Sequence, residues 1–146
     1  MTVTKDGYTI STDKHILNIP YIHAFLTTSY WAEGIPVNTV QRSVDGALCF
    51  GVYKDGVQVG FARMISDLAT YAYLADVFID ESQRGKGLGK WLVEVILQHP
   101  ELQGLRRIEL ATRDAHSLYA QLGFTPLPQP DRFMQIRNPD VYKNLP

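Results

Sequence analysis

A run of alternating glycines is the part of this sequence best suited to chemistry. It joins an apolar stretch that ends at Ile79 to a helix-like stretch that begins near Leu88. Glycines let backbone N–H groups approach a ligand closely, and a helix start adds unpaired donors and the positive end of the helix dipole. The run therefore predicts a site for a phosphate-bearing cofactor, formed by Arg84, Gly85, Lys86, Gly87, Leu88, Gly89 and Lys90.

The spacing of these glycines separates the kinds of phosphate-binding loop. A P-loop has four residues between its first glycine and a Gly-Lys pair followed by Ser or Thr, but here three residues separate Gly85 from Gly89 and tryptophan follows Lys90. A Rossmann fingerprint needs a third glycine where this chain has Lys90. Glu109 lies about where that fold has its ribose-binding acid, so a nucleotide-binding oxidoreductase stays open as an alternative.

The remaining pattern, Arg84-x-x-Gly87-x-Gly89, resembles the pyrophosphate-binding motif of the GCN5-related N-acetyltransferases. A second segment, Ala115 to Phe124, resembles the A-x-x-L-Y-x-x-x-G-F pattern of the fourth helix in the same family. The two segments lie at the family's spacing, and the two segments with the residues around and between them cover residues 70 to 125. The resemblance implies acetyl-coenzyme A (acetyl-CoA) as the cofactor.

The resemblance also implies roles around the cofactor. It places Phe78 and Ile79 beside the pantetheine arm, with a backbone N–H between Val77 and Ile79 as the oxyanion donor. Tyr119 matches the tyrosine that protonates the thiolate in many relatives, although a tyrosine packed in the core would give the same pattern. Thr112 stands where the family often has an asparagine, and its hydroxyl can supply one hydrogen bond to the cofactor.

The general base is where this sequence departs from the family pattern. Many relatives carry Glu-Asp in the strand before the glycines, where this chain has Ala75-Asp76. Asp76 is therefore a candidate base, or else a structural acid paired with the backbone or with Arg63. Strand alternation puts Ala75 on one face and Asp76 on the other. A base is unnecessary if the amine arrives neutral or water removes its proton, and His116 is better interpreted as a solvated or capping residue.

The acceptor pocket is expected between the first two helices and the long strands. Tyr30 and Trp31 are adjacent aromatic residues that cannot both face the core, and aromatic side chains can enclose a substrate. Arg63 and Tyr73 complete the predicted substrate site, and Glu33, Tyr53 and Asp67 are further candidates for its lining. The acceptor is expected to be a primary amine of a small molecule or of an exposed peptide. The alternative is a binding module that keeps acyl-CoA but has lost the chemistry.

The hydrophobic pattern predicts an α/β fold with a mixed sheet, in which an antiparallel N-terminal meander precedes parallel strands joined by a crossover helix. An Asp-Gly pair predicts a hairpin between two of the strands, and a capping Asn18 before proline predicts a helix. The predicted strands are Tyr8–Ser11, Ala47–Tyr53, Val57–Ile65, Tyr71–Ile79, Leu105–Ala111 and a closing Phe133–Arg137, with helices after Asn18, over Val37–Val44, from Leu88 and over Ala115–Leu122.

Length and composition restrict the class of protein further. A chain of 146 residues predicts one domain, residues 1–146, and a net charge of -1 argues against a nucleic-acid partner. The lone Cys49 favours a reducing compartment, and without a signal-like or membrane-spanning run we expect a cytoplasmic protein that does not enter a membrane. We further expect a surface tail over 138–146 and a homodimer formed through edge strands at the C-terminus.

Overall fold

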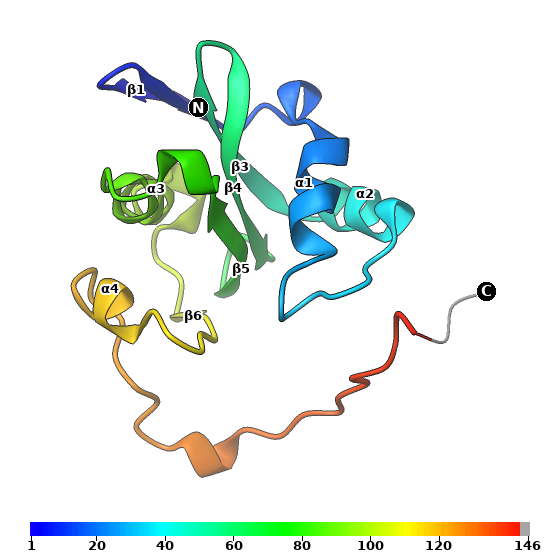
Figure 1. Cartoon of the computed structure of the whole chain (residues 1–146). Helices are drawn as coiled ribbons and strands as arrows, with labels where there is room; N and C mark the ends of the chain where they lie inside the picture. Colours follow the sequence, from blue (N-terminus) through cyan, green and yellow to red (C-terminus); the bar gives the residue numbers. More distant parts are fainter. Residues whose placement is uncertain (144–146) are drawn as a thin grey trace.

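The computed structural model describes residues 1–143, and its framework is a six-stranded sheet in the order β1-β2-β3-β4-β5-β6 (Figure 1). Strands β1 to β5 run antiparallel to their neighbours, and β6 runs parallel to β5. The predicted mixed sheet is therefore confirmed. The strands are β1 (Thr2–Lys5), β2 (Tyr8–Ser11), β3 (Leu48–Lys54), β4 (Val57–Ser66), β5 (Tyr71–Ile79) and β6 (Arg107–Glu109).

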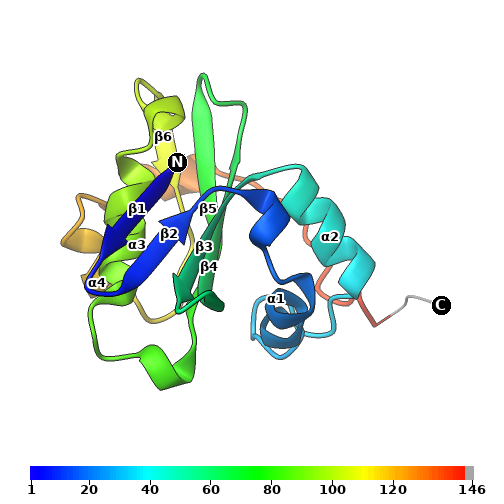
Figure 2. The same cartoon turned by 90° about the horizontal axis from the view of Figure 1, so that it is seen from above.

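Helices cover both faces of the sheet (Figure 2). Helices α1 and α2 pack on one face, and α3 and α4 pack on the other. Asn18 begins α1 because its side chain accepts a hydrogen bond from the N–H of Tyr21 at 3.0 Å, the capping that the sequence predicted. The helices are α1 (Ile19–Leu26), α2 (Val37–Asp45), α3 (Leu88–Leu97) and α4 (His116–Ala120), with short 3-10 turns η1 (Lys14–Ile16), η2 (Glu81–Gln83), η3 (Pro100–Leu102) and η4 (Pro130–Arg132).

Two Asp-Gly pairs close the two N-terminal hairpins. Asp55 and Gly56 have φ angles of 50° and 78° between β3 and β4, which is the left-handed geometry of a tight hairpin turn. Asp6 and Gly7, with φ angles of 53° and 83°, do the same between β1 and β2. Strand β1 was not among the predicted strands, although its turn carries the same signal.

The core consists of two apolar clusters, one on each face of the sheet. Phe61 of β4 belongs to the cluster beneath α1 and α2, whereas its neighbour Ala62 and Met64 belong to the cluster beneath α3. The central strands are thus buried on both faces, as in a three-layer α/β protein. Residues of the central strands β4 and β5 are thereby held in place where they line the candidate site.

The C-terminal part of the chain departs from the predicted strands. Strand β6 is only three residues long, because it pairs with the first three residues of β5 and then diverges from it. The closing strand predicted over Phe133–Arg137 is wrong, since those residues form no strand and Met134 and Ile136 are fully exposed. Of the predicted tail, 144–146 lies outside the described residues, and Tyr142 packs against the α1/α2 cluster. Among residues 1–143, no helix has the length and apolar character needed to cross a membrane.

Burial of the only cysteine gives a pH-dependent contribution to stability. Cys49 is 1% exposed, and burial raises the pKa of its thiol from about 9 to about 11. The unfolded chain therefore loses this proton first, so the contribution is complete below pH 9 and is lost as the pH rises toward 11. We expect wild type to lose about 2 kcal/mol more unfolding free energy than Cys49→Ala between pH 8 and pH 11, measured by urea denaturation. Parallel losses in both proteins would contradict this.

Candidate active site

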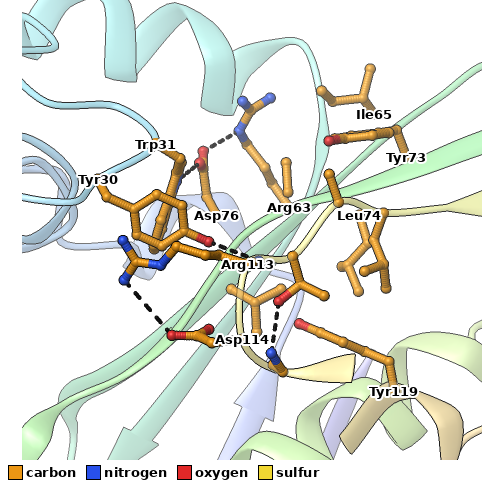
Figure 3. A pocket seen from close by; sticks show the side chains of 16 residues that line it. Tyr30, Trp31, Arg63, Ile65, Tyr73, Leu74, Asp76, Arg113, Asp114 and Tyr119 are labelled. Atoms are coloured by element: carbon orange, nitrogen blue, oxygen red, sulfur yellow. Dashed lines mark hydrogen bonds and ion pairs between the residues drawn. The ribbon is translucent and has the colours of Figure 1, made fainter. Parts of the chain in front are cut away.

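The sheet opens between its two parallel strands. Tyr71 to Tyr73 pair with β6, and beyond Tyr73 the strand β5 has no partner on that side. A cavity of about 500 Å³ occupies the opening, with β4 and β5 on one side and the β6–α4 segment on the other (Figure 3). Seven of the residues predicted from the sequence line this one cavity: Tyr30, Trp31, Arg63, Tyr73, Asp76, Thr112 and Tyr119.

A β-bulge in β5 turns an acidic residue into this cavity. The pairing of β4 with β5 shifts register between Phe61 and Arg63, and Asp76 has a left-handed φ of 57°. Aspartate tolerates this conformation better than most residues because its short side chain can bond locally. Asp76 consequently bonds to Arg63, which pairs with Ala75 and shares its face, so the alternation predicted from the sequence is wrong at this residue.

The bulge also determines which backbone amides face the opening. The N–H of Asp80 donates to the carbonyl of Val59 on β4 at 2.7 Å. Because backbone groups of successive strand residues point to opposite edges, the N–H groups of Ile79 and Val77 face away from β4 and toward the opening. These are the amides among which the sequence predicted an oxyanion donor.

Both carboxylate oxygens of Asp76 are already hydrogen-bonded. Nε of Arg63 donates to one oxygen at 2.5 Å, and Nε1 of Trp31 donates to the other at 2.8 Å (Figure 3). The ion pair is well buried, with 18% of the arginine side chain and 7% of the aspartate side chain exposed. Asp76 therefore ties the loop after α1 to the strand β4, which is the structural alternative weighed for this residue.

Tyr119 lies on the opposite wall of the cavity, in α4. It is 9% exposed, and its ring packs edge-to-face on Phe124 at a centroid distance of 5.7 Å. Burial, and to a smaller extent Tyr30, raise the pKa of the Tyr119 phenol, which keeps it protonated at neutral pH. Thr112 prepares the start of α4, because its hydroxyl oxygen accepts a hydrogen bond from the N–H of Ala115 at 3.1 Å.

An aromatic and cationic group forms the outer wall. Tyr30 and Trp31 meet edge-to-face at 5.1 Å, and each is about half exposed. The guanidinium of Arg113 lies 3.9 Å from the centroid of the Tyr30 ring, within the range of a cation–π contact. Arg113 was not predicted, because a single arginine in a loop gives no signal in one sequence. Its charge is partly offset by Asp114, at 3.7 Å.

The glycine run follows β5 directly. Asp80 accepts hydrogen bonds from Ser82 and from the hydroxyl of Tyr21, and Nε of Arg84 donates to the carbonyl of Ile79 at 3.1 Å. Gly85 and Gly87 have left-handed φ angles of 79° and 77°. A Cβ atom added at either position would meet no atom within 4 Å, so the space beside these glycines is open.

The other residues of the predicted cofactor site divide between core and surface. Phe78 and Ile79 are buried, and the Phe78 ring stacks on Phe25 at 3.9 Å, so only their backbone can reach a ligand. Lys86 contacts the Tyr8 hydroxyl at 3.3 Å. Lys86, Gly87 and Leu88 border a separate cavity of about 220 Å³, and Gly89 and Lys90 lie in the first turn of α3.

Glu109, the candidate ribose-binding acid, lies on β6 rather than at the end of a Rossmann strand. Its carboxylate is 3.7 Å from the guanidinium of Arg107, and its side chain is 14% exposed. The antiparallel order of β1 to β5 does not fit a doubly wound parallel sheet. Within residues 1–143, no group of three or more His, Cys, Asp or Glu side chains could hold a metal ion.

A mixed sheet that opens between parallel strands beside a glycine-rich helix start is the architecture of an acetyltransferase. The family model described as the acetyltransferase (GNAT) family matches residues 14–124. The chain belongs to the GNAT acetyltransferase family, as the two sequence motifs indicated. The Rossmann fold of a dinucleotide-binding oxidoreductase is therefore excluded as the fold of this chain.

Individual relatives agree with this assignment. The chain is 49% identical to a protein of Xanthomonas campestris pv. campestris whose crystal structure is described as belonging to the GNAT family. The TM-score is 0.91, with 94% of this chain and 97% of that chain covered. This chain is also 30% identical to the Gibberella zeae protein "Putative acetyltransferase FG08082", over 81% of this chain and 78% of that protein. A Clostridium acetobutylicum structure, described as a predicted acetyltransferase with acetyl-CoA, shares the fold with a TM-score of 0.64 at 12% identity, over 89% of this chain and 94% of that chain.

Proposed function

We propose that this protein is a single-domain N-acetyltransferase that moves an acetyl group from acetyl-CoA to the primary amine of a small molecule or an exposed peptide. Transfer is direct, with both substrates bound at once. The observation that carries the proposal is the cavity between β5 and β6, where the bulge at Asp76 and the phenol of Tyr119 lie on facing walls. Family membership and a structural neighbour described with acetyl-CoA support the choice of cofactor.

The residues around the glycine run fit the cofactor. Acetyl-CoA, when bound, supplies the activated thioester. The backbone amides from Arg84 to Gly89 would hold its pyrophosphate, since the open space beside Gly85 and Gly87 leaves their N–H groups accessible. The free edge of β5 at Phe78 and Ile79 would pair with the pantetheine arm, and the Thr112 hydroxyl has a proton left to donate to it.

Residues on the two facing walls of the cavity would have different roles in the acetyl transfer. The N–H of Val77 would stabilise negative charge on the acetyl oxygen while the amine nitrogen bonds to the acetyl carbon. Tyr119 would give its phenolic proton to the departing sulfur and then regain a proton from water, since its raised pKa keeps it protonated at neutral pH. The amine's own proton would leave to water through the open mouth of the cavity, which Tyr30 and Trp31 border.

We assign Asp76 a positioning role rather than that of a general base. Both of its oxygens already accept hydrogen bonds, from Arg63 and Trp31, and a proton taken from the substrate would remove the charge of its buried ion pair with Arg63. Its contribution would be to fix the indole and the guanidinium in the acceptor wall. The acceptor would then be recognised by aromatic contact with Tyr30, Trp31 and Tyr73.

Release of coenzyme A tests the reaction. A thiol-reactive dye would follow turnover of acetyl-CoA with a panel of small primary amines and short peptides, and mass spectrometry would identify the acetylated product. We expect turnover on at least one amine and none without an acceptor. Tight binding of acetyl-CoA without turnover on any amine would support the alternative, a non-catalytic acyl-CoA-binding module.

Two matched glycine variants test the cofactor loop. Gly87 and Gly56 have φ angles of 77° and 78° and open space around them, so alanine strains both by roughly 1–2 kcal/mol. Only Gly87→Ala adds a methyl group beside the predicted pyrophosphate. We expect it to weaken acetyl-CoA binding about 10-fold or more, measured by calorimetry, and Gly56→Ala to leave the affinity unchanged. Equal affinities in the two variants would count against this loop.

A further inference from the structure

Two arginines line the cavity between β5 and β6, and their surroundings differ. Arg63 and Arg113 share the lining with two acids, Asp76 and Asp114. Arg113 is on the outside, where 64% of its side chain is exposed and water can satisfy its N–H groups. Only 18% of the Arg63 side chain is exposed. The hydrogen bonds of Arg63 therefore matter more to what the cavity can bind.

Arg63 uses only a small part of its hydrogen-bonding capacity. A guanidinium has five N–H groups and no acceptor. The Nε–H of Arg63 donates to Asp76, but among residues 1–143 no group accepts a hydrogen bond from its terminal nitrogens, Nη1 and Nη2. Figure 3 shows these two nitrogens beyond Nε, on the side away from the Asp76 carboxylate. The N–H groups of Nη1 and Nη2 thus remain for water or for a ligand.

Asp76 fixes the direction of this terminal edge. Its second oxygen accepts a hydrogen bond from Nε1 of Trp31 at 2.8 Å, so the carboxylate cannot turn without losing a bond. Its charge also lowers the cost of burying the guanidinium. Held at Nε, the guanidinium presents parallel N–H groups on Nη1 and Nη2, which match the two oxygens of one carboxylate. This order exists before a ligand arrives, which favours binding.

On the basis of the acetyl transfer proposed above, we propose that the acceptor is a small primary amine that also carries a carboxylate, and that Nη1 and Nη2 of Arg63 bind this carboxylate as a pair. Arg63 then determines specificity, whereas the aromatic side chains of Tyr30 and Trp31 enclose the carbon chain. Charge agrees with this class of acceptor. The two arginines and two aspartates of the lining sum to zero, as do the ammonium and the carboxylate of an amino acid.

The distance to the reacting atoms limits the shape of the acceptor. Arg63 of β4 pairs with Ala75 of β5, and the proposed oxyanion donor, the N–H of Val77, is two residues further along β5. Two residues of a strand span about 7 Å. The amine and the carboxylate of the acceptor are therefore separated by several carbon atoms rather than attached to the same one.

Matched pairs of substrates test the carboxylate without altering the protein. Each pair is an ω-amino acid and its carboxamide, which have the same amine and the same length but differ in charge. With the wild-type protein, we expect kcat/KM to be about 100-fold or more higher for the acid than for the amide, and higher for the longer chains than for free glycine. Equal kcat/KM for acid and amide would overturn the carboxylate site and leave the proposed acetyl transfer intact.

Arginine variants test which guanidinium is responsible. Arg63→Lys keeps a cation beside Asp76 but has no planar fork, so we expect the acid-to-amide ratio of kcat/KM to fall about 10-fold or more. A purely structural loss would lower both values and leave their ratio unchanged. Arg113→Gln removes the other guanidinium of the same cavity and should keep the ratio within about threefold of wild type. An unchanged ratio in Arg63→Lys, or loss of the ratio in Arg113→Gln alone, would overturn the proposal.

Calorimetry separates this proposal from the proposed reaction. An ω-amino acid with a chain of four methylene groups and its amide are titrated into wild type and into Arg63→Lys, each with coenzyme A present. We expect the acid to bind about 10-fold or more tightly than its amide in wild type, and the two to bind about equally in the variant. If this difference is found but no amine is acetylated, the proposed reaction fails and the carboxylate site stands. Equal affinities of acid and amide in wild type would overturn the carboxylate site.

Discussion

We expect Tyr119→Phe to lower kcat by about 100-fold to 1,000-fold and to change KM for acetyl-CoA and for the amine by less than about threefold. The phenol is buried on the wall of the cavity, its ring is fixed by Phe124, and its raised pKa keeps it protonated. Phenylalanine keeps the ring and its packing but removes the one proton that this residue could give to the thiolate. Steady-state kinetics with the best amine of the panel measures the effect.

Tyr30→Phe is the matched control for this variant. Tyr30 has a phenol in the same cavity, but it lies on the outer wall under Arg113, and phenylalanine can keep that stacking contact. We expect its kcat to stay within about 10-fold of wild type. Since the Tyr119 phenol stays protonated, wild-type kcat should also not fall between roughly pH 7 and pH 9 through ionisation of this residue. Unchanged turnover in Tyr119→Phe would refute the role.

Asp76→Asn is expected to cost about 2–4 kcal/mol of unfolding free energy. The amide oxygen can still accept the indole N–H of Trp31, and asparagine tolerates the left-handed φ of 57°. The guanidinium of Arg63, with 18% of its side chain exposed, would lose its counter-charge. Urea denaturation measures the loss, which should be smaller when the same substitution is made in an Arg63→Gln background.

The pH profile of the same variant separates positioning from base catalysis. If Asp76 only positions Arg63 and Trp31, KM for the amine rises and the acidic limb of the kcat/KM profile keeps its shape. If Asp76 were the general base, the acidic limb of the kcat/KM profile would instead be lost in Asp76→Asn. Loss of that limb, with kcat reduced about 1,000-fold or more in a stable Asp76→Asn protein, would contradict the positioning role.

Local signals in the sequence were sufficient for much of the fold. The Asp55-Gly56 turn, the Asn18 cap and the strand Tyr71–Ile79 are each determined by neighbours along the chain, and the structure has them where they were predicted. Strand β6 and the segment 133–137 depend on contacts between distant residues. The sequence pattern at Phe133–Arg137 is that of a strand, but nothing in it tells whether a partner edge lies within reach.

The residues of the candidate site could be predicted where they belong to a family motif. They could not be predicted where the backbone departs from regular strand alternation. Tyr119 and the glycine run follow from the motifs, whereas the bulge at Asp76 reverses the face that alternation gives. The bond from Trp31 to Asp76 joins residues 45 positions apart, which no periodicity encodes. The place of Arg113 in the cavity wall is recognised only from its contact with the Tyr30 ring in the structure.

We propose the opening between β5 and β6, with the glycine run at its end, as the site for acetyl-CoA. Isothermal titration calorimetry of the wild-type protein with acetyl-CoA, and separately with NAD, tests this assignment without any knowledge of the acceptor. We predict one acetyl-CoA per chain with a dissociation constant between about 1 μM and 1 mM, and no binding of NAD. Binding of NAD without binding of acetyl-CoA, or no binding of either, would contradict it.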